Sequence, residues 1–137
     1  MDSRAIREGV EAVLKEALFP AQETLEDRQT LMGDLGAESI DMLDIEQRLE
    51  RRVGISLRDN RMRPLDALDD PKNLADGRLT ATGAGELQRR YPFVSWELYT
   101  GKTVHEIADA VVTVGYVCAL VAHELEAQQK QEATAPA

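Results

Sequence analysis

Apolar side chains in the first part of the chain recur at the spacing of one helix face. Within residues 3–18 the period of these positions predicts an amphipathic helix. Its apolar residues are Ile6, Val10, Val13, Leu14, Ala17 and Leu18. Pro20 predicts where this helix stops. A long connection follows, and we expect Leu25, Leu31 and Leu35 to anchor it to the core, because a loop of this length usually packs or has a function.

A second amphipathic helix is predicted to begin near Ser39, with apolar residues on two of its sides. At 100° per residue, one narrow arc holds the residues that we expect in the core. These are Met42, Ile45, Leu49 and Val53. Ile40 and Leu43 fall on the opposite side and predict a surface that contacts a partner. The alternative is that they are scattered exposed apolar residues, which are common on proteins.

The last third of the chain predicts one long helix. Thr103 and Glu106 form a capping-box signal, and the helical pattern continues to about residue 128. Its second half is apolar all round, which requires cover on a second face. The residues that need this cover are Tyr116, Val117 and Leu120. We expect either the aromatic segment PFVSWELY or a second copy of the chain to provide it.

The middle of the chain is the least regular part. Proline and glycine recur through residues 58–100, and we interpret this stretch as an insertion. Within it, LTATGAGELQRRYP predicts a short helix that is capped by Thr80 or Thr82 and ends before Pro92. Residues 129–137 predict a disordered tail.

The amino-acid composition favours a helical protein. The 137 residues suit one domain with a modest core, and aromatic residues are scarce, with one Trp, three Tyr and two Phe. Leu, Ile, Val and Ala pack helices well, whereas a β-sandwich usually carries more aromatic residues. The predicted fold class is therefore all-α, with a single domain over residues 1–128.

Charge is unevenly distributed along the chain. Residues 1–50 carry 13 acidic and 5 basic side chains, a net of −8, whereas residues 51–100 carry 9 basic and 7 acidic, a net of +2. The overall charge of −9 argues against nucleic-acid binding, and the acidic first third predicts partners with basic docking surfaces. Five arginines form either a local basic patch or a solvated face. They are Arg51, Arg52, Arg58, Arg61 and Arg63.

Cysteine use and hydropathy predict a cytoplasmic protein. Cys118 is the single cysteine, so no internal disulfide forms, as is typical of a reducing cytosol. The longest apolar run, residues 110–122, is too short to span a bilayer. We expect Cys118 to be a small buried residue of the last helix.

Residues 34–57, DLGAESIDMLDIEQRLERRVGISL, resemble the phosphopantetheine-attachment region of acyl carrier proteins. The pattern of that family is Asp-Leu-Gly-Ala or Gly, an acidic residue, Ser-Leu, and then an acidic amphipathic helix that closes on Phe-Gly-Ile. The resemblance extends to the first helix, to the leucine-anchored loop and to the TVHEIADAVV opening of the last helix. It therefore covers about residues 3–57 and 103–113.

This resemblance implies a fold and a cofactor. The fold is an acyl-carrier-like four-helix bundle with an inserted helical segment and a long C-terminal helix. Ser39 would carry 4′-phosphopantetheine, which a phosphopantetheinyl transferase installs from coenzyme A with magnesium. A serine at a helix N-cap suits this attachment, because its hydroxyl is exposed beside unpaired N–H groups and the helix dipole favours an anion.

The resemblance also implies partners, while the chain itself performs no catalysis. Acyl-loading and acyl-using enzymes of a lipid or polyketide-like pathway, such as fatty acid biosynthesis, would dock beside Ser39. The predicted recognition residues are Glu38, Ile40, Asp41, Leu43, Asp44 and Gln47.

The sequence departs from the family in several places. Glu38 and Ile40 replace the usual residues beside the serine, and Glu46 and Gln47 stand where the helix of the family is generally apolar. The usual acidic face is interrupted by Arg48, Arg51 and Arg52. Together with the insertion and the extended last helix, these changes favour a specialised carrier with dedicated partners.

Other interpretations of the same residues stay open. The chain could be a non-enzymatic helical interaction protein, unmodified at Ser39, or a peptidyl carrier. A hydrolase nucleophile at Ser39 would need a base, and no Gly-x-Ser-x-Gly motif is present. Glu38, Asp41 and Asp44 could bind a metal, but an acidic recognition surface is favoured and no resident metal is predicted. The expected oligomeric state is a monomer or a homodimer.

Overall fold

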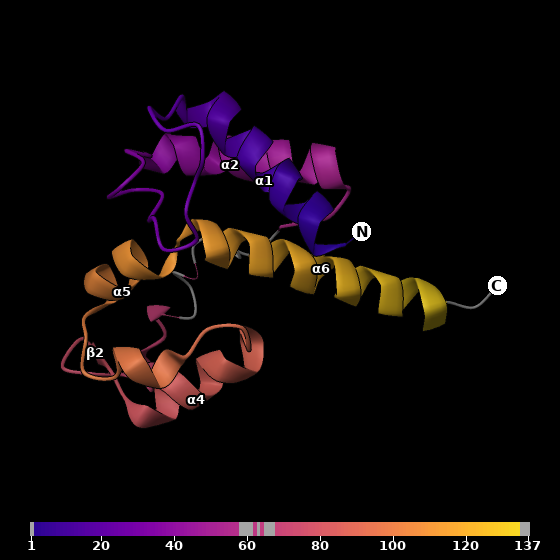
Figure 1. The fold of residues 1–137 in the computed structure, drawn as a ribbon. Coiled ribbons are helices and arrows are strands. Elements are labelled where there is room, and N and C mark those ends of the chain that lie inside the picture. The colour runs from indigo at the N-terminus through magenta and orange to yellow at the C-terminus, as the bar shows by residue number, and fades with distance from the viewer. Residues whose placement is uncertain (1, 58–61, 63, 65–67, 135–137) are drawn as a thin grey trace.

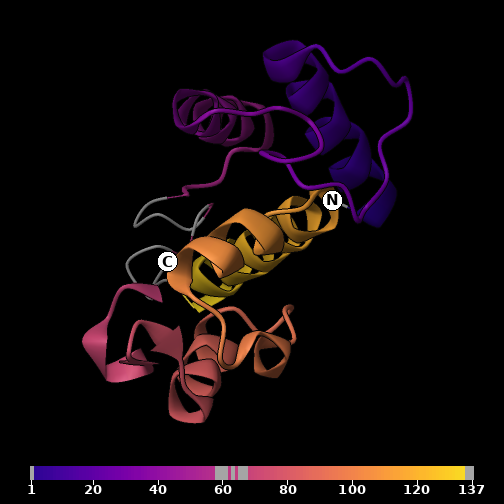
Figure 2. The same ribbon diagram turned by 90° about the vertical axis from the view of Figure 1, so that its left-hand side faces the viewer.

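The helices lie in three layers, which both ribbon views separate clearly (Figures 1 and 2). The computed structural model describes residues 2–57, 62, 64 and 68–134. One outer layer holds α1 (Ser3–Leu18) and α2 (Ser39–Val53), and the middle layer holds α5 (Val104–Val111) and α6 (Val114–Thr134). The other outer layer contains α4 (Ala81–Arg90), the short 3₁₀ turns η1 (Pro71–Asn73) and η2 (Trp96–Tyr99), and the two-residue strands β1 (Leu74–Ala75) and β2 (Arg78–Leu79).

The predicted first helix is confirmed with its bounds. The Asp2 carboxylate accepts a hydrogen bond of 2.8 Å from the Ala5 N–H and so caps α1. At the other end, Phe19 takes a left-handed conformation with φ of 49°. Four apolar residues of the predicted face are buried: Ile6, Val10, Val13 and Leu14. This face packs α1 against α2 and α6.

The two sides of α2 are also as the pattern predicts. Met42, Ile45 and Leu49 are buried, and Val53 is half-buried at the end of the helix. On the opposite side, Ile40 is 74% and Leu43 56% exposed. These two residues therefore lie outside the core and are open to a partner.

The long connection between α1 and α2 packs on the middle layer. The three predicted anchors, Leu25, Leu31 and Leu35, are buried. The backbone of the connection also pairs with the junction between α5 and α6, where the Leu31 N–H donates to the Val112 carbonyl oxygen over 3.0 Å. Thr30 and Thr113 form an antiparallel bridge at the same place. This connection is therefore an ordered part of the core.

The prediction of one continuous last helix is wrong. The chain forms two helices, α5 and α6, because the backbone at Val112 and Thr113 bonds to the α1–α2 connection. The Thr113 hydroxyl oxygen then accepts the Tyr116 N–H over 3.0 Å and begins α6. The second helix continues to Thr134, so residues 129–134, which the sequence assigns to a disordered tail, are helical.

The insertion covers α6, as the apolar second face of that helix predicts. Thr80 caps α4 by accepting the Gly83 N–H over 3.0 Å, and the helix ends before Pro92. The Phe93 ring lies 5.5 Å from the Tyr116 ring, measured between centroids. The residues that required cover, Tyr116, Val117 and Leu120, are all buried. This intramolecular packing accounts for their burial without a second copy of the chain.

The fold class is all-α, apart from the two short strands of one hairpin. Apolar residues from all three layers form a shared core. Among the helices that the structure describes, none has the length and hydrophobicity needed to span a lipid bilayer.

Candidate functional site

A closed turn leads the chain into Ser39. The Thr30 N–H donates to the Asp34 carboxylate over 2.9 Å, and the Asp34 N–H donates to the Thr30 hydroxyl over 3.0 Å. Leu35 and Ala37 are then buried, and the Ala37 N–H donates to the Leu31 carbonyl oxygen over 2.8 Å. These contacts fix the position of the backbone two residues before Ser39.

Gly36 lies between the two buried residues of this turn. Its φ of 73° is in the left-handed region that glycine adopts without strain. Apart from Gly36 itself and its two chain neighbours, no heavy atom of the described residues lies within 4 Å of the place where a Cβ would stand. The turn therefore needs glycine for its backbone conformation and leaves open space beside the start of α2.

The expectation that Ser39 is the N-cap of α2 is wrong by one residue. The N-cap is Glu38, and the Asp41 carboxylate accepts the Glu38 N–H over 2.8 Å. Ser39 is instead the first helical residue; its side chain is exposed and forms no hydrogen bond with any residue that the structure describes. Its hydroxyl is consequently available, at the helix end where N–H groups and the dipole favour an anion.

The predicted recognition residues are only partly free for a partner. Glu38, Ile40, Leu43 and Gln47 are exposed. Asp41 is half-buried and caps the helix, as described above. The outer side of α2 near Ser39 thus presents apolar groups with few free acidic ones.

Asp44, the last of the predicted recognition residues, is engaged within the helix. Its carboxylate accepts from the Arg48 guanidinium at 3.0 Å, and Arg48 also donates to Glu16 of α1 over 3.2 Å. The hydrogen bond and the charge of Asp44 raise the pKa of Arg48. The acidic surface expected around Asp44 is therefore partly neutralised.

The acidic residues around Ser39 do not assemble a metal site. Within the part of the chain that the structure describes, no three His, Cys, Asp or Glu side chains lie close enough to hold a metal ion. Of the expected arginine patch, Arg51 and Arg52 are exposed at the end of α2, whereas Arg58, Arg61 and Arg63 lie outside the described residues.

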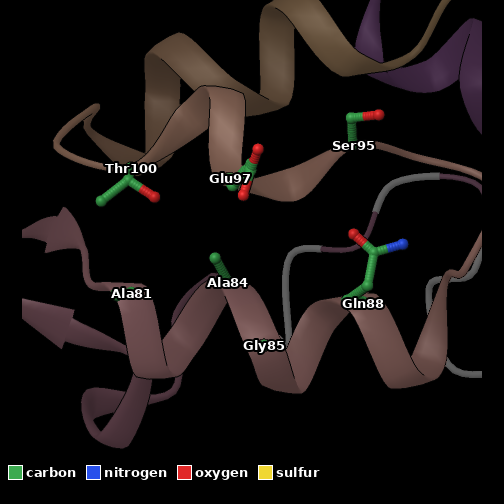
Figure 3. A pocket seen from close by; sticks show the side chains of 7 residues that line it. All are labelled: Ala81, Ala84, Gly85, Gln88, Ser95, Glu97 and Thr100. Carbon is green, nitrogen blue, oxygen red and sulfur yellow. The ribbon is translucent and has the colours of Figure 1, made fainter.

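Two hollows involve the insertion, and Ser39 lines neither of them. One, of about 340 Å³, is bounded by α4 and by the chain around η2 (Figure 3). The small residues Ala81, Ala84 and Gly85 form its floor. Their spacing along one face of α4 is the signal that the sequence offers for this hollow. The other hollow, of about 210 Å³, lies against the start of α6.

The walls of the larger hollow are held by one side chain of α4. The Gln88 side-chain nitrogen donates to the Pro92 carbonyl oxygen over 3.0 Å, and the Gln88 side-chain oxygen accepts the backbone N–H of Trp96 over 3.3 Å. In Figure 3, Ala84 and Gln88 extend from α4 toward the segment that carries Ser95 and Glu97. Gln88 thus ties this segment to α4 at one end of the hollow.

Comparisons of the chain with protein-family models, with curated proteins and with solved structures give no match.

Proposed function

We propose that the protein is an acyl carrier whose Ser39 bears 4′-phosphopantetheine. The observation that supports this function is the exposed, unengaged hydroxyl of Ser39 at the first residue of α2, directly after the Gly36 turn. The surrounding residues fit the group, because the open space beside Gly36 admits it and the N-terminal end of α2 favours its phosphate. The attached group supplies a thiol that holds an acyl chain as a thioester.

The chain's own residues position this arm and present it to partners. In attachment, the Ser39 hydroxyl oxygen would bond to the phosphorus next to pantetheine, and the pyrophosphate bond of coenzyme A would break. Adenosine 3′,5′-bisphosphate would leave, and the serine proton would pass to a base of the transferase. The buried Leu35 and Ala37 keep the attachment point fixed relative to the core. In this proposal, α1, α2 and the α5–α6 pair correspond to the carrier bundle, and residues 58–100 are an addition to it.

The attachment is tested by mass spectrometry after incubation with coenzyme A and phosphopantetheinyl transferases of broad specificity. We expect a gain of one phosphopantetheine in the wild-type chain and none in Ser39→Ala. A Cys118→Ala background makes the test sharper, because any thiol then detected belongs to the arm. A chain that stays at its unmodified mass with several transferases contradicts the proposal.

Partner contact is tested with a matched pair of leucines on α2. Leu43 is 56% exposed, so Leu43→Glu should impair transferase or acyl-enzyme reactions while the fold stays intact. Leu49 is fully buried, so Leu49→Ala should lower the free energy of unfolding by about 2–5 kcal/mol. Modification rates and urea denaturation of both variants measure these effects. Unfolding of the Leu43 variant would contradict the assignment of its face.

One observation favours the second candidate, a non-enzymatic interaction protein. Ile40 and Leu43 are large, apolar and exposed, which suits contact with a partner whether or not Ser39 is modified. The mass measurement separates the two functions, because the interaction protein needs no arm. If an arm is present, loading with amino acids in place of acyl groups distinguishes a peptidyl carrier.

A further inference from the structure

Phe19, the residue that ends α1, combines an unfavourable backbone conformation with an exposed ring. Its φ of 49° lies in the left-handed region, which costs free energy for a bulky side chain. Pro20 follows, and a residue before proline favours an extended backbone, which opposes this conformation further. Phe19 is 83% exposed, so burial in the core does not offset the cost. Packing within the fold therefore does not explain a phenylalanine at this position.

Ending the helix does not require an aromatic side chain. The Phe19 N–H donates to the Lys15 carbonyl oxygen over 3.1 Å and closes the last turn of α1. At the end of α2, the Gly54 N–H donates to the Glu50 carbonyl oxygen over 2.9 Å in the same way, with a φ of 80°. Glycine adopts this conformation without strain. A glycine at position 19 would thus end α1 equally well, and the ring is what phenylalanine adds.

The ring lies toward the same end of the α1–α2 pair as the proposed attachment site. Figure 1 shows the two helices side by side, and their contacts show that they run in opposite directions. A Cβ on Gly9, in the first half of α1, would lie 3.8 Å from the Arg52 side chain near the end of α2. Further along α1, Glu16 accepts from Arg48, which precedes Arg52 by one turn. The end of α1 therefore lies toward the start of α2, which begins at Ser39.

The charge around this end of the helix pair limits the kind of partner. Residues 16–47, from the last turn of α1 to the middle of α2, contain nine acidic side chains and one basic side chain, a net of −8. Several of these carboxylates are paired, but Glu23 is exposed and forms no ion pair with any residue that the structure describes. A partner that covers the Phe19 ring should therefore offer an apolar pocket with basic groups at its rim.

We infer that Phe19 is an anchor residue for the transferase that modifies Ser39, and that its ring enters an apolar pocket of that protein between basic groups. The inference rests on the proposed function and adds a contact from α1 to those of α2. The transferase is the partner that must reach the Ser39 hydroxyl, so it approaches the end of the helix pair where the ring lies. Pro20 and the left-handed backbone restrict the main chain beside the ring, and this preorganisation lowers the entropic cost of binding. A few aromatic anchors of this kind provide much of the binding energy at protein interfaces.

Modification kinetics test the anchor with the full chain, coenzyme A and a phosphopantetheinyl transferase of broad specificity. Phe19→Ala removes the ring, and the control Leu98→Ala removes a side chain of similar exposure, 71%, from η2 in the other outer layer. We expect Phe19→Ala to raise the KM for the chain roughly tenfold with kcat unchanged, because the ring binds equally before and during the reaction. Leu98→Ala should change neither constant. A wild-type KM in Phe19→Ala would overturn the inference.

Thermal unfolding separates the anchor from a structural role of the ring. Phe19→Gly should melt above Phe19→Ala, because glycine relieves the left-handed backbone. Both variants should nevertheless have the raised KM, since both lack the ring. If the wild-type chain melts well above both variants while the KM stays the same in all three, the ring stabilises the fold and the inference is wrong.

Photo-crosslinking identifies what covers the ring. The residue p-benzoylphenylalanine takes the place of Phe19 in one chain and of Leu98 in the control chain, and each is irradiated with the transferase. We expect an adduct with the transferase from position 19 and none from position 98. Adducts between two copies of the chain from position 19, without any transferase adduct, would assign the ring to self-association and overturn the inference. Higher ionic strength should also raise the wild-type KM, because salt screens the basic rim from the acidic segment.

The same measurements distinguish failure of this inference from failure of the proposed function. If the wild-type chain gains no phosphopantetheine with several transferases, the carrier function fails, and the inference about Phe19 fails with it. If the wild-type chain and Phe19→Ala are modified with the same KM, the carrier function stands and only the anchor role of Phe19 is lost.

Discussion

At the start of α2, neighbouring residues have separate roles in capping and in the proposed chemistry. Glu38 is the N-cap, and Asp41 accepts its N–H over 2.8 Å. This arrangement satisfies a donor at the helix start without the Ser39 hydroxyl. The sequence suggested Ser39 itself as the cap, because serine is among the preferred N-cap residues. The sequence predicts an exposed serine at the start of α2. It does not predict that Glu38 is the N-cap in place of Ser39, because this depends on the backbone conformation of Glu38.

The first prediction follows from this division. Ser39→Ala should change the free energy of unfolding by less than about 0.5 kcal/mol, as is usual for exposed positions. Asp41→Ala removes the hydrogen bond to Glu38 and should cost about 1 kcal/mol. Urea denaturation of the unmodified chains measures both values. An equal loss in both variants would show that the Ser39 hydroxyl contributes to the fold.

The second prediction concerns the only thiol of the chain. Cys118 is half-buried, not buried as the sequence predicts, and this partial burial raises its pKa, while Arg7 opposes the shift and Glu11 adds to it. The pKa of the Cys118 thiol is therefore higher in the folded protein than in the unfolded chain, where it is about 8.5. The contribution of the thiol to folding stability is complete below the unfolded-state pKa and is lost as pH rises through the folded-state pKa. The stability of the wild-type chain relative to Cys118→Ala should therefore fall between pH 7 and pH 10. Urea denaturation of both chains at the two pH values measures this change.

The difference between the two chains isolates the thiol, since tyrosines and lysines also titrate in this range and contribute equally to both. The same partial burial and raised pKa should make Cys118 react more slowly with iodoacetamide in the folded protein than in the unfolded chain. A relative stability that is constant from pH 7 to pH 10 would contradict the assigned environment of Cys118.

At the scale of elements, helices that depend on local periodicity were predictable and the break between α5 and α6 was not. The apolar stripes of α1 and α2 lie within each helix, so a short window of sequence contains the whole signal. The break depends on bonds from residues far away, such as Leu31 to Val112, which no local pattern reveals. The Thr113 hydroxyl begins α6, but Thr113 lies within the apolar run 110–122, where the helical pattern of the sequence continues without a break.

The third prediction compares two glycines of α4. A Cβ on Gly83 would lie 2.3 Å from the backbone oxygen of Asn73, so Gly83→Ala should destabilise the protein by about 1–3 kcal/mol through overpacking. A Cβ on Gly85 would meet nothing within 4 Å, because it faces the hollow of Figure 3. Gly85→Ala should therefore add about 0.5–1 kcal/mol through helix propensity.

Thermal unfolding of the two variants beside the wild type tests this pair. Both substitutions add the same atoms to the same helix, so the opposite signs isolate the contact with Asn73. Loss of stability in Gly85→Ala would mean that the hollow is filled by the chain itself.

At the scale of the whole molecule, α6 packs against both outer layers, the layer of α1 and α2 and the layer of α4. One side of it packs on α1, and the other side carries Tyr116 against the Phe93 ring. The resemblance to acyl carriers covers the regions of α1, α2 and α5, whereas α6 and the insertion lie outside it. That an insertion should fold over α6 was predictable from Tyr116, Val117 and Leu120, because apolar residues on a second face require cover.

The last prediction is that all three layers unfold together. Trp96 is the only tryptophan of the chain and is fully buried in the layer of α4, so its fluorescence reports on the insertion. Far-UV circular dichroism is dominated by the long helices α1, α2 and α6. The helix α6 packs on both outer layers, so unfolding of either layer exposes one side of α6 to water. We therefore expect the fluorescence and circular dichroism transitions to occur at the same urea concentration.

A matched pair of substitutions strengthens this test. Leu14→Ala, in the first layer, and Leu87→Ala, in the layer of α4, each remove a fully buried leucine and should each cost about 2–5 kcal/mol. In a single cooperative unit, both variants shift the fluorescence and the dichroism transitions by the same amount. If Leu87→Ala moves only the fluorescence transition, the insertion unfolds independently. The packing of Phe93 on Tyr116 would then be lost while the helices around Ser39 stay folded.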